Sequence, residues 1–361
     1  MRYVILIMFI AMELLTFPLC RLHAEPSQSG KIFTDNRGRN VHITRPIRRI
    51  AVNHLSVSEA LKILGCWEMV VARDTQTTDT MIFDGLEQIP VITLHSGGPY
   101  SFNFEALFAA KPDILICEDI PMDGFEEMVA KLPPEIPVFM VRLNRLSTLE
   151  ENILKLGKLL DKEKSAREFT QWHSELTKRL TNKTARLSAS EKTRYLFKTG
   201  YGSPDDIMTF TDTFDGIAER NRIIGGINVA AGLPSTGGWV QAVNPEWLAV
   251  QKIDVIVCCD PIRDGYGCQI QNTAKAAAHR NRFLALPHVA ATKASRTGNV
   301  HMISGEFFAT ARATVGNAYL AKWLHPELFA DLKPEEIFQE YLGRFLHADV
   351  DLTKTGVFTY P

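Results

Sequence analysis

An internal repeat is the feature that most constrains the fold of this chain. Shifting the sequence by 141 positions aligns residues 97–119 with residues 238–260 without a gap, and eight of the 23 aligned positions are identical. The identical pairs are Gly97/Gly238, Asn103/Asn244, Glu105/Glu246, Leu107/Leu248, Lys111/Lys252, Asp113/Asp254, Cys117/Cys258 and Asp119/Asp260. A fixed shift over this many positions predicts two copies of one structural unit.

Within each copy the pattern is that of a short helix followed by a buried strand. Asn103 and Asn244 are placed to cap the helix, and the apolar runs 114–116 and 255–257 indicate the strand. Further strands are expected at 47–52, 137–141 and 193–198, and a capping box at 56–59 predicts a helix that ends near Gly65. Alternating short strands and helices favour parallel sheets with helical crossovers.

Between the two copies the pattern becomes helical. A second capping box at 147–150 begins one helix, and residues 163–187 form another with an apolar face. That face carries Phe169, Trp172, Leu176 and Leu180. A helix of this length extends about 37 Å, enough to connect two lobes as a stiff spacer that allows only a small rocking motion. The alternative left open is that both helices pack on a single large domain.

The predicted fold class is therefore α/β, with two Rossmann-like lobes of parallel sheet joined by a long helix and a ligand cleft between them. The predicted segments are a signal peptide (1–24), an N-terminal lobe (31–146), a helical linker (147–188), a C-terminal lobe with terminal helices (189–347) and a tail (348–361).

The first residues have the pattern of a cleavable export signal. Arg2 precedes an apolar run, and the segment 22–24 (Leu-His-Ala) is an acceptable cleavage site. Glu13 interrupts the run, which is shorter than the roughly 20 residues that span a membrane, so cleavage is favoured over a membrane anchor. Cys20 lacks the small preceding residue typical of lipidation signals, which disfavours a lipid anchor.

Charge, cysteines and missing motifs exclude several classes of protein. The 40 Lys and Arg residues balance 41 Asp and Glu residues, which leaves no basic field for nucleic acid. Cys117 and Cys258 are expected to be buried. An oxidising compartment would allow a disulfide between Cys259 and Cys268, and the sequence does not decide whether it forms. No GxSxG, HExxH, P-loop or complete GxGxxG motif occurs, since the Gly-Tyr-Gly runs 200–202 and 265–267 lack the third glycine. Neither catalysis nor a cofactor is predicted.

Short segments in a fixed order along the chain carry a family resemblance. They are 33–39 (FTDNRGR), 50–53 (IAVN), 104–107 (FEAL), 111–113 (KPD), 224–230 (IGGINVA), 243–246 (VNPE) and 321–326 (AKWLHP). In this order they resemble the exported substrate-binding proteins of ABC importers for chelated iron, haem and cobalamin, the helical-backbone class III binding proteins. The resemblance covers roughly residues 31–347.

The resemblance implies a periplasmic, monomeric binding protein without enzymatic activity. Such a protein captures a metal chelate, foremost an iron–siderophore, and delivers it to two membrane-spanning permease subunits with their ATPase. It also implies that Glu105 and Glu246, each in the first turn of a repeated helix, dock into arginine-bearing pockets of those two subunits. A helix dipole stabilises a carboxylate at this position, which alone could explain one of the two.

The candidate ligand site consists of polar and aromatic residues in loops that follow predicted strands. Ligands of open parallel sheets bind outside the carboxyl ends of the strands, and two facing lobes would enclose a ligand between them. The candidate ligand-binding residues are His54, Tyr100, Glu118, Tyr201, Trp239, Arg263 and Arg312. The aromatic rings could stack on a ligand ring, and Arg312 suits an anionic group. No set of metal ligands is specified.

Each of these assignments has an alternative. His54 could be satisfied by nearby backbone, the aromatic residues could pack between the lobes, and Arg312 could form a surface ion pair. Two other functions remain open for the whole chain. One is binding of an oxyanion such as molybdate or tungstate in a polar cleft around Arg312. The other is a chelatase-like enzyme that processes tetrapyrroles with Glu118 and His54.

Overall fold

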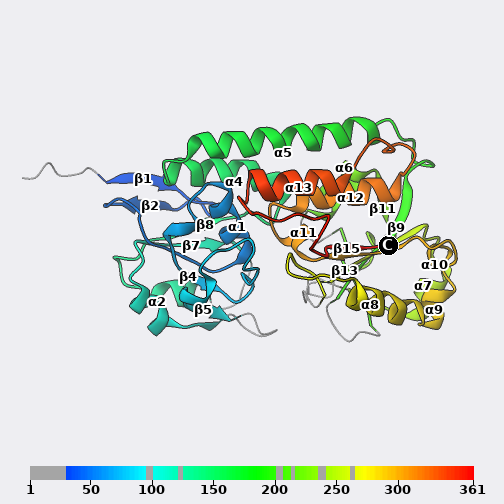
Figure 1. Cartoon of the computed structure of the whole chain (residues 1–361), viewed down its shortest axis with the longest axis horizontal. Coiled ribbons are helices and arrows are strands. Elements are labelled where there is room, and N and C mark those ends of the chain that lie inside the picture. Colours follow the sequence, from blue (N-terminus) through cyan, green and yellow to red (C-terminus); the bar gives the residue numbers. More distant parts are fainter. Residues whose placement is uncertain are drawn as a thin grey trace, which may run out of the picture.

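The structure is a computed structural model that describes residues 30–94, 101–120, 125–200, 206–212, 216–234, 241–260 and 265–361. Figure 1 shows two lobes side by side, with helix α5 (Glu163–Thr184) running along one side of both. The expected signal peptide lies outside the described residues.

The N-terminal lobe is built on a six-stranded sheet in the order β6-β5-β4-β3-β7-β8. Its strands are β3 (Ile50–Val52), β4 (Val70–Asp74), β5 (Val91–Leu94), β6 (Ser101–Phe102), β7 (Ile114–Glu118) and β8 (Val138–Val141). Only β6 pairs antiparallel. The hairpin β1 (Lys31–Thr34) and β2 (Asn40–Ile43) precedes the sheet, and its helices are α1 (Leu55–Ile63), α2 (Phe104–Ala110) and α3 (Phe125–Ala130). Cores form on both faces of β3 and β7.

The C-terminal lobe has its own seven-stranded sheet, in the order β12-β10-β9-β13-β14-β15 with β11 also paired to β9. The strands are β9 (Thr193–Thr199), β10 (Ile207–Thr209), β11 (Gly226–Asn228), β12 (Gln241–Val243), β13 (Val255–Asp260), β14 (Val300–Ser304) and β15 (Thr359–Tyr360). The helices are α6 (Ile217–Ile224), α7 (Pro245–Val250), α8 (Ala274–Leu284), α9 (Pro287–Ala290), α10 (Lys293–Arg296), α11 (Glu306–Ala309), α12 (Ala313–Leu324) and α13 (Pro334–Arg344). The two sheets share no strand, which confirms the predicted two-lobed α/β class. Strand β15 comes from the tail, where the sequence indicated no element.

The internal repeat extends further in the structure than in the sequence. Arg49, just before β3, donates from Nε to the Lys111 carbonyl over 3.0 Å. Arg194, at the start of β9, makes the same bond to Lys252 over 2.9 Å. The two lysines are related by the shift of 141 positions, but the two arginines are 145 positions apart. The lysine follows the arginine by 62 positions in the first lobe (111 − 49) and by 58 in the second (252 − 194), so one fixed shift could not reveal this equivalence.

Two expected helix starts were wrong. Helix α1 begins at Leu55, and its N-cap is His54, whose Nδ1 accepts from the backbone N–H of Ser56 over 3.1 Å. The Ser56 hydroxyl, expected to cap the helix, bonds Glu118 instead. Helix α4 (Leu146–Leu159) begins with Arg145 at its N-cap, so its supposed capping serine lies inside the first turn. At α1 a tertiary contact of the serine overrides the local pattern.

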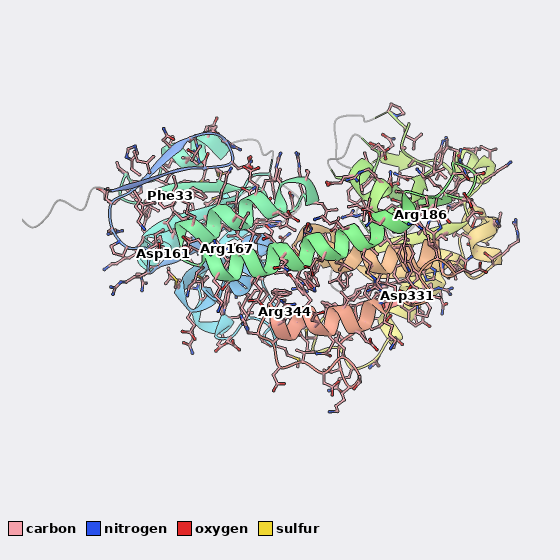
Figure 2. All side chains as sticks on the ribbon, turned by 90° about the horizontal axis from the view of Figure 1, so that it is seen from above. Phe33, Asp161, Arg167, Arg186, Asp331 and Arg344 are labelled. Carbon is pink, nitrogen blue, oxygen red and sulfur yellow. The ribbon has the colours of Figure 1, made fainter. Side chains whose placement is uncertain are left out.

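Helix α5 does not connect the lobes alone, because α13 lies along it (Figure 2). Arg344 binds Glu168 over 3.1 Å at one end of α13, and Asp331 binds Lys183 over 2.6 Å before the other end. Trp172 of α5 packs against Tyr341 of α13 and against Phe345, the residue just after α13, with ring centroids 5.6 and 5.0 Å apart. Phe169 of α5 also packs against Phe345. The 22 residues of α5 span about 33 Å. The spacer is therefore a packed helix pair, stiffer than one helix.

The five described cysteines are all free and buried, so Cys259 and Cys268 form no disulfide. The expected burial of Cys117 and Cys258 is confirmed. Among the described residues, no helix combines the length and hydropathy needed to span a bilayer.

The contact between α4 and α5 predicts a strict size limit at Gly157. A Cβ atom there would lie 2.5 Å from the Cβ of Ala166, so Gly157→Ala should overpack the helix pair. We expect the free energy of unfolding to fall by about 1–3 kcal/mol in urea titrations. The control is Gly343→Ala in α13, where the added methyl meets no atom within 4 Å. That variant should gain up to about 1 kcal/mol from helix propensity, and equal stability of the two variants would contradict the packing argument.

Candidate functional site

A cavity of about 170 Å³ lies between the two lobes. Its lining residues are Thr78 and Asp79 of the N-terminal lobe, and Gly265, Tyr266, Gly267, Gln269, Ile270, Lys275 and Glu306 of the C-terminal lobe. This is smaller than the roughly 300 Å³ of pockets that hold drug-sized ligands. A drug-sized ligand would therefore not fit within this cavity alone.

Asp79 makes a direct polar contact between the lobes. Its Oδ2 accepts from the backbone N–H of Cys268 over 2.9 Å, while Oδ1 accepts from the N–H of Met81 in its own loop. The carboxylate is buried, and both of its oxygens are occupied. A hydrogen bond to a carboxylate contributes about 1.5–3 kcal/mol net, so it helps to hold the lobes together.

Arg312 lies in a buried ion cluster that joins α1 to the start of α12. Its Nε donates to Glu59 over 2.7 Å, and its Nη1 pairs with Glu306. Tyr341 and Thr310 also donate to Glu59, over 2.5 and 2.9 Å. All five side chains are buried. Burial alone would lower the pKa of Arg312, but the two carboxylates raise it above its ordinary value.

For Arg312 the sequence left an ion pair open as the alternative to a ligand contact. The structure contains that ion pair, buried instead of on the surface. Among the described residues, Nη2 of Arg312 is buried without a hydrogen-bond partner, so one donor remains for a ligand or a water. Contact with a ligand stays a prediction.

The ion cluster predicts a large loss of stability when its cation is removed. Arg312→Met leaves two buried carboxylates without a counter-charge, which should cost about 3–5 kcal/mol in urea unfolding. The matched control is Arg344→Met, since Arg344 is half-exposed and its ion pairs lie at the surface. The control should lose less than about 1 kcal/mol. A loss of the same size in both variants would show that the buried cluster contributes no more to the free energy of unfolding than surface ion pairs do.

His54 and Glu118 meet at the carboxyl ends of β3 and β7, with the Ser56 hydroxyl between them. The hydroxyl oxygen lies 2.5 Å from Oε2 of Glu118 and 2.8 Å from Nδ1 of His54. Glu118 is fully buried, and it also accepts from the backbone N–H of Leu143 over 3.0 Å. The serine hydroxyl donates to Glu118, and the oxygen of that hydroxyl lies within hydrogen-bonding distance of His54. Although these donors favour the carboxylate, burial raises the pKa of Glu118 to about 7.

The raised pKa of Glu118 predicts a pH dependence of stability. The folded chain holds this proton up to about pH 7, whereas the unfolded chain loses it near the ordinary value of 4.5. Stability from this group is therefore complete below pH 4.5 and is lost as the pH rises to 7, by about 3 kcal/mol. Glu118→Gln should remove this part of the pH dependence in urea unfolding. An identical pH profile for the variant and the wild type would contradict the assignment.

Glu105 and Glu246 occupy equivalent places in the two lobes. Asn103 caps α2 by accepting from the backbone N–H three residues on, over 3.0 Å, and Asn244 caps α7 in the same way over 2.7 Å. This confirms both predicted caps. Each glutamate is exposed in the first turn of its helix and has no ion pair or hydrogen bond to another described residue. In Figure 1 both helices lie on the side of the molecule away from α5.

The other predicted site residues lie outside the described residues. They are Tyr100, Tyr201, Trp239 and Arg263. Sequence reasoning missed Asp79 and Lys275, whose only signal is their position after β4 and in α8. It also passed over the run 265–267 as an incomplete phosphate-binding motif, although these residues line the cavity. Within the described ranges, no three His, Cys, Asp or Glu side chains are grouped to hold a metal ion.

Residues 50–306 match the family described as "Periplasmic binding protein", so the chain belongs to that family. Members of this family are periplasmic proteins that bind small solutes and deliver them to ABC permeases; they are not enzymes. Among curated proteins, no sequence matches the chain.

Solved structures show the same fold at low sequence identity. The TroA-like periplasmic binding protein FepB from Veillonella parvula has a TM-score of 0.74 at 18% identity, over 91% of this chain and 99% of that chain. The Haemophilus influenzae protein MolA bound to molybdate has a TM-score of 0.68 at 17% identity, over 89% and 99%. A haem-binding protein from Pseudomonas aeruginosa has a TM-score of 0.60 at 21% identity, over 78% and 94%.

Proposed function

We propose that this chain is the periplasmic substrate-binding protein of an ABC importer for a metal chelate. The observation that carries the proposal is the pair of exposed, unpaired carboxylates of Glu105 and Glu246 on equivalent helices of the two lobes. A permease with two membrane-spanning subunits presents two similar surfaces, so one lobe docks on each. Residues 1–24 serve as the export signal, and the mature chain acts as a monomer without a resident cofactor.

The proposed ligand is an iron–siderophore, with haem or cobalamin as further members of the same class. Tyr100, Tyr201 and Trp239 would supply aromatic walls, and His54, Glu118 and Arg263 polar contacts. The likeness to a haem-binding protein from Pseudomonas aeruginosa supports a chelate as the ligand. Such a ligand is larger than the cavity beside Asp79, so the proposed site includes the loops that carry these aromatic residues.

An oxyanion is the second candidate, favoured by the likeness to MolA bound to molybdate. The charge around Arg312 argues against it. A bare oxyanion needs a cation with free donors, whereas this guanidinium is already paired with Glu59 and Glu306. Its Nε and Nη1 groups are engaged, and among the described residues only the Nη2 group is left without a partner. The cluster therefore suits a structural role between α1 and α12 better than capture of a small dianion.

In the proposed mechanism, ligand binds between the lobes and docking on the permease separates them. The Asp79 bond to Cys268 must break in this motion, at a cost of about 1.5–3 kcal/mol for a hydrogen bond to a carboxylate. The packed pair of α5 and α13 and the ion cluster stay intact, which limits the motion to a small angle. The permease therefore needs to supply only modest energy from its own docking contacts to release the ligand.

Replacing both docking glutamates tests the proposal. The double variant Glu105→Ala, Glu246→Ala should abolish uptake of the chelate by cells while its affinity for the chelate in calorimetry stays at the wild-type value. The control is Glu163→Ala with Glu335→Ala, two exposed glutamates in the first turns of α5 and α13. Cells with the control variant should import normally. Wild-type uptake by the double docking variant would refute the docking role.

A further inference from the structure

Four large apolar side chains are exposed among the described residues. They are Ile32 (57% exposed), Phe108 (41%), Leu154 (41%) and Val250 (77%). Ile32 belongs to β1 and Leu154 to α4. Phe108 lies on α2 and Val250 on α7, the two helices that carry Glu105 and Glu246. Single exposed apolar residues are ordinary, but two of these four fall on one pair of equivalent helices.

On each helix the apolar side chain and the glutamate share one face. Phe108 follows Glu105 by three residues, and Val250 follows Glu246 by four, which are the spacings of neighbours on a helix surface. The opposite face of each helix is fixed to its lobe by an equivalent leucine, Leu107 or Leu248, and both leucines are fully buried. The glutamate and the apolar group are therefore held outward together.

The two patches are similar without being identical. The repeat aligns the exposed positions 108 and 109 with 249 and 250, which read Phe-Ala in α2 and Ala-Val in α7. Each helix thus offers one large apolar side chain at one of two adjacent positions. Neither group belongs to a hydrophobic core of the described residues. Val250 is mostly exposed, and Phe108 packs against Phe104 of the same helix with ring centroids 6.0 Å apart.

We propose that Phe108 and Val250 are the apolar centres of two matched docking patches, each of which binds an apolar depression on one membrane-spanning permease subunit. This inference rests on the proposed function and adds a second kind of contact to it. Stable interfaces combine a water-free apolar centre with a charged rim, and the exposed glutamate beside each apolar group supplies that rim. A basic border around the depression complements the carboxylate.

The two kinds of contact predict different kinetic effects. Rim charges steer the encounter and set its salt dependence, so Glu105 and Glu246 should govern the association rate. Buried apolar contacts act after the encounter, so Phe108 and Val250 should govern the dissociation rate. Phe108 offers the larger surface, and aromatic groups dominate binding hot spots, so its loss should weaken docking more than the loss of Val250.

The test measures binding of the full mature chain to the host's chelate-importing permease, purified with its ATPase and reconstituted in lipid nanodiscs. Association and dissociation rates are recorded by biolayer interferometry at low and high ionic strength. The variants are Phe108→Ala with Val250→Ala, each of these changes alone, and Glu105→Ala with Glu246→Ala. The matched control is Ile32→Ala with Leu154→Ala, which removes the other two exposed apolar groups. Alanine suits every helical position, and thermal unfolding checks that each variant folds.

We expect the Phe108 and Val250 double variant to dissociate about tenfold faster or more, with its association rate and salt dependence unchanged. The control should bind as the wild type does. This inference is overturned if the Phe108 and Val250 double variant dissociates at the wild-type rate, or if the control variant is weakened equally. In that case, loss of docking by the glutamate variant would still support the proposed function. If the wild-type chain does not bind the permease at all, the proposed function itself fails.

Discussion

The connection between the lobes depends on Tyr341. Its ring packs against Trp172 and Phe169 of α5, and its hydroxyl donates to Glu59, the carboxylate that binds Arg312. The aromatic contact of α13 with α5 and the buried ion cluster thus share one side chain. Because an unpaired charge at this depth is costly, α1, α12 and α13 are held in one arrangement. Lobe motion is restricted to what this junction allows.

A stiff junction allows the repeated surface features of the two lobes to act as one binding surface. Flexible lobes could present α2 and α7 in many relative positions, whereas a fixed spacer keeps their outward faces at a defined separation. Each helix ends against its sheet through the same contact, an arginine that donates to the carbonyl of the lysine after the helix. Equivalent anchoring makes the two glutamates and their apolar neighbours a paired surface, which suits a partner with two similar subunits.

The sequence predicted those parts of the fold that follow local patterns. The asparagine caps, the buried strands and the long helix depend on neighbours in the chain, and all are present. The sequence patterns failed where the partner of a side chain lies far away along the chain. Glu59 and Arg312 meet across 253 positions, so nothing local marked that pair. His54 replaces Ser56 as the cap of α1 because Glu118, far along the sequence, takes the serine hydroxyl.

The candidate ligand site was the least predictable part. His54 and Glu118 lie at the carboxyl ends of β3 and β7, as the strand pattern predicted, whereas Arg312 lies between α11 and α12 and binds Glu59 of the other lobe. Each of the three is buried and bound to protein groups that no local pattern encodes. Their contact with a ligand stays a prediction. Asp79, which connects the lobes directly, carries no motif at all.

The most direct test of the account is photo-crosslinking from the two repeated helices. A photoreactive amino acid is placed at Ala109 in α2 or at Ala249 in α7, both exposed beside the proposed apolar centres, and the protein is irradiated with the reconstituted permease. The account predicts that each position crosslinks to one membrane-spanning subunit and that a doubly substituted chain captures two. Crosslinking from one lobe alone, or from neither, would contradict docking through both.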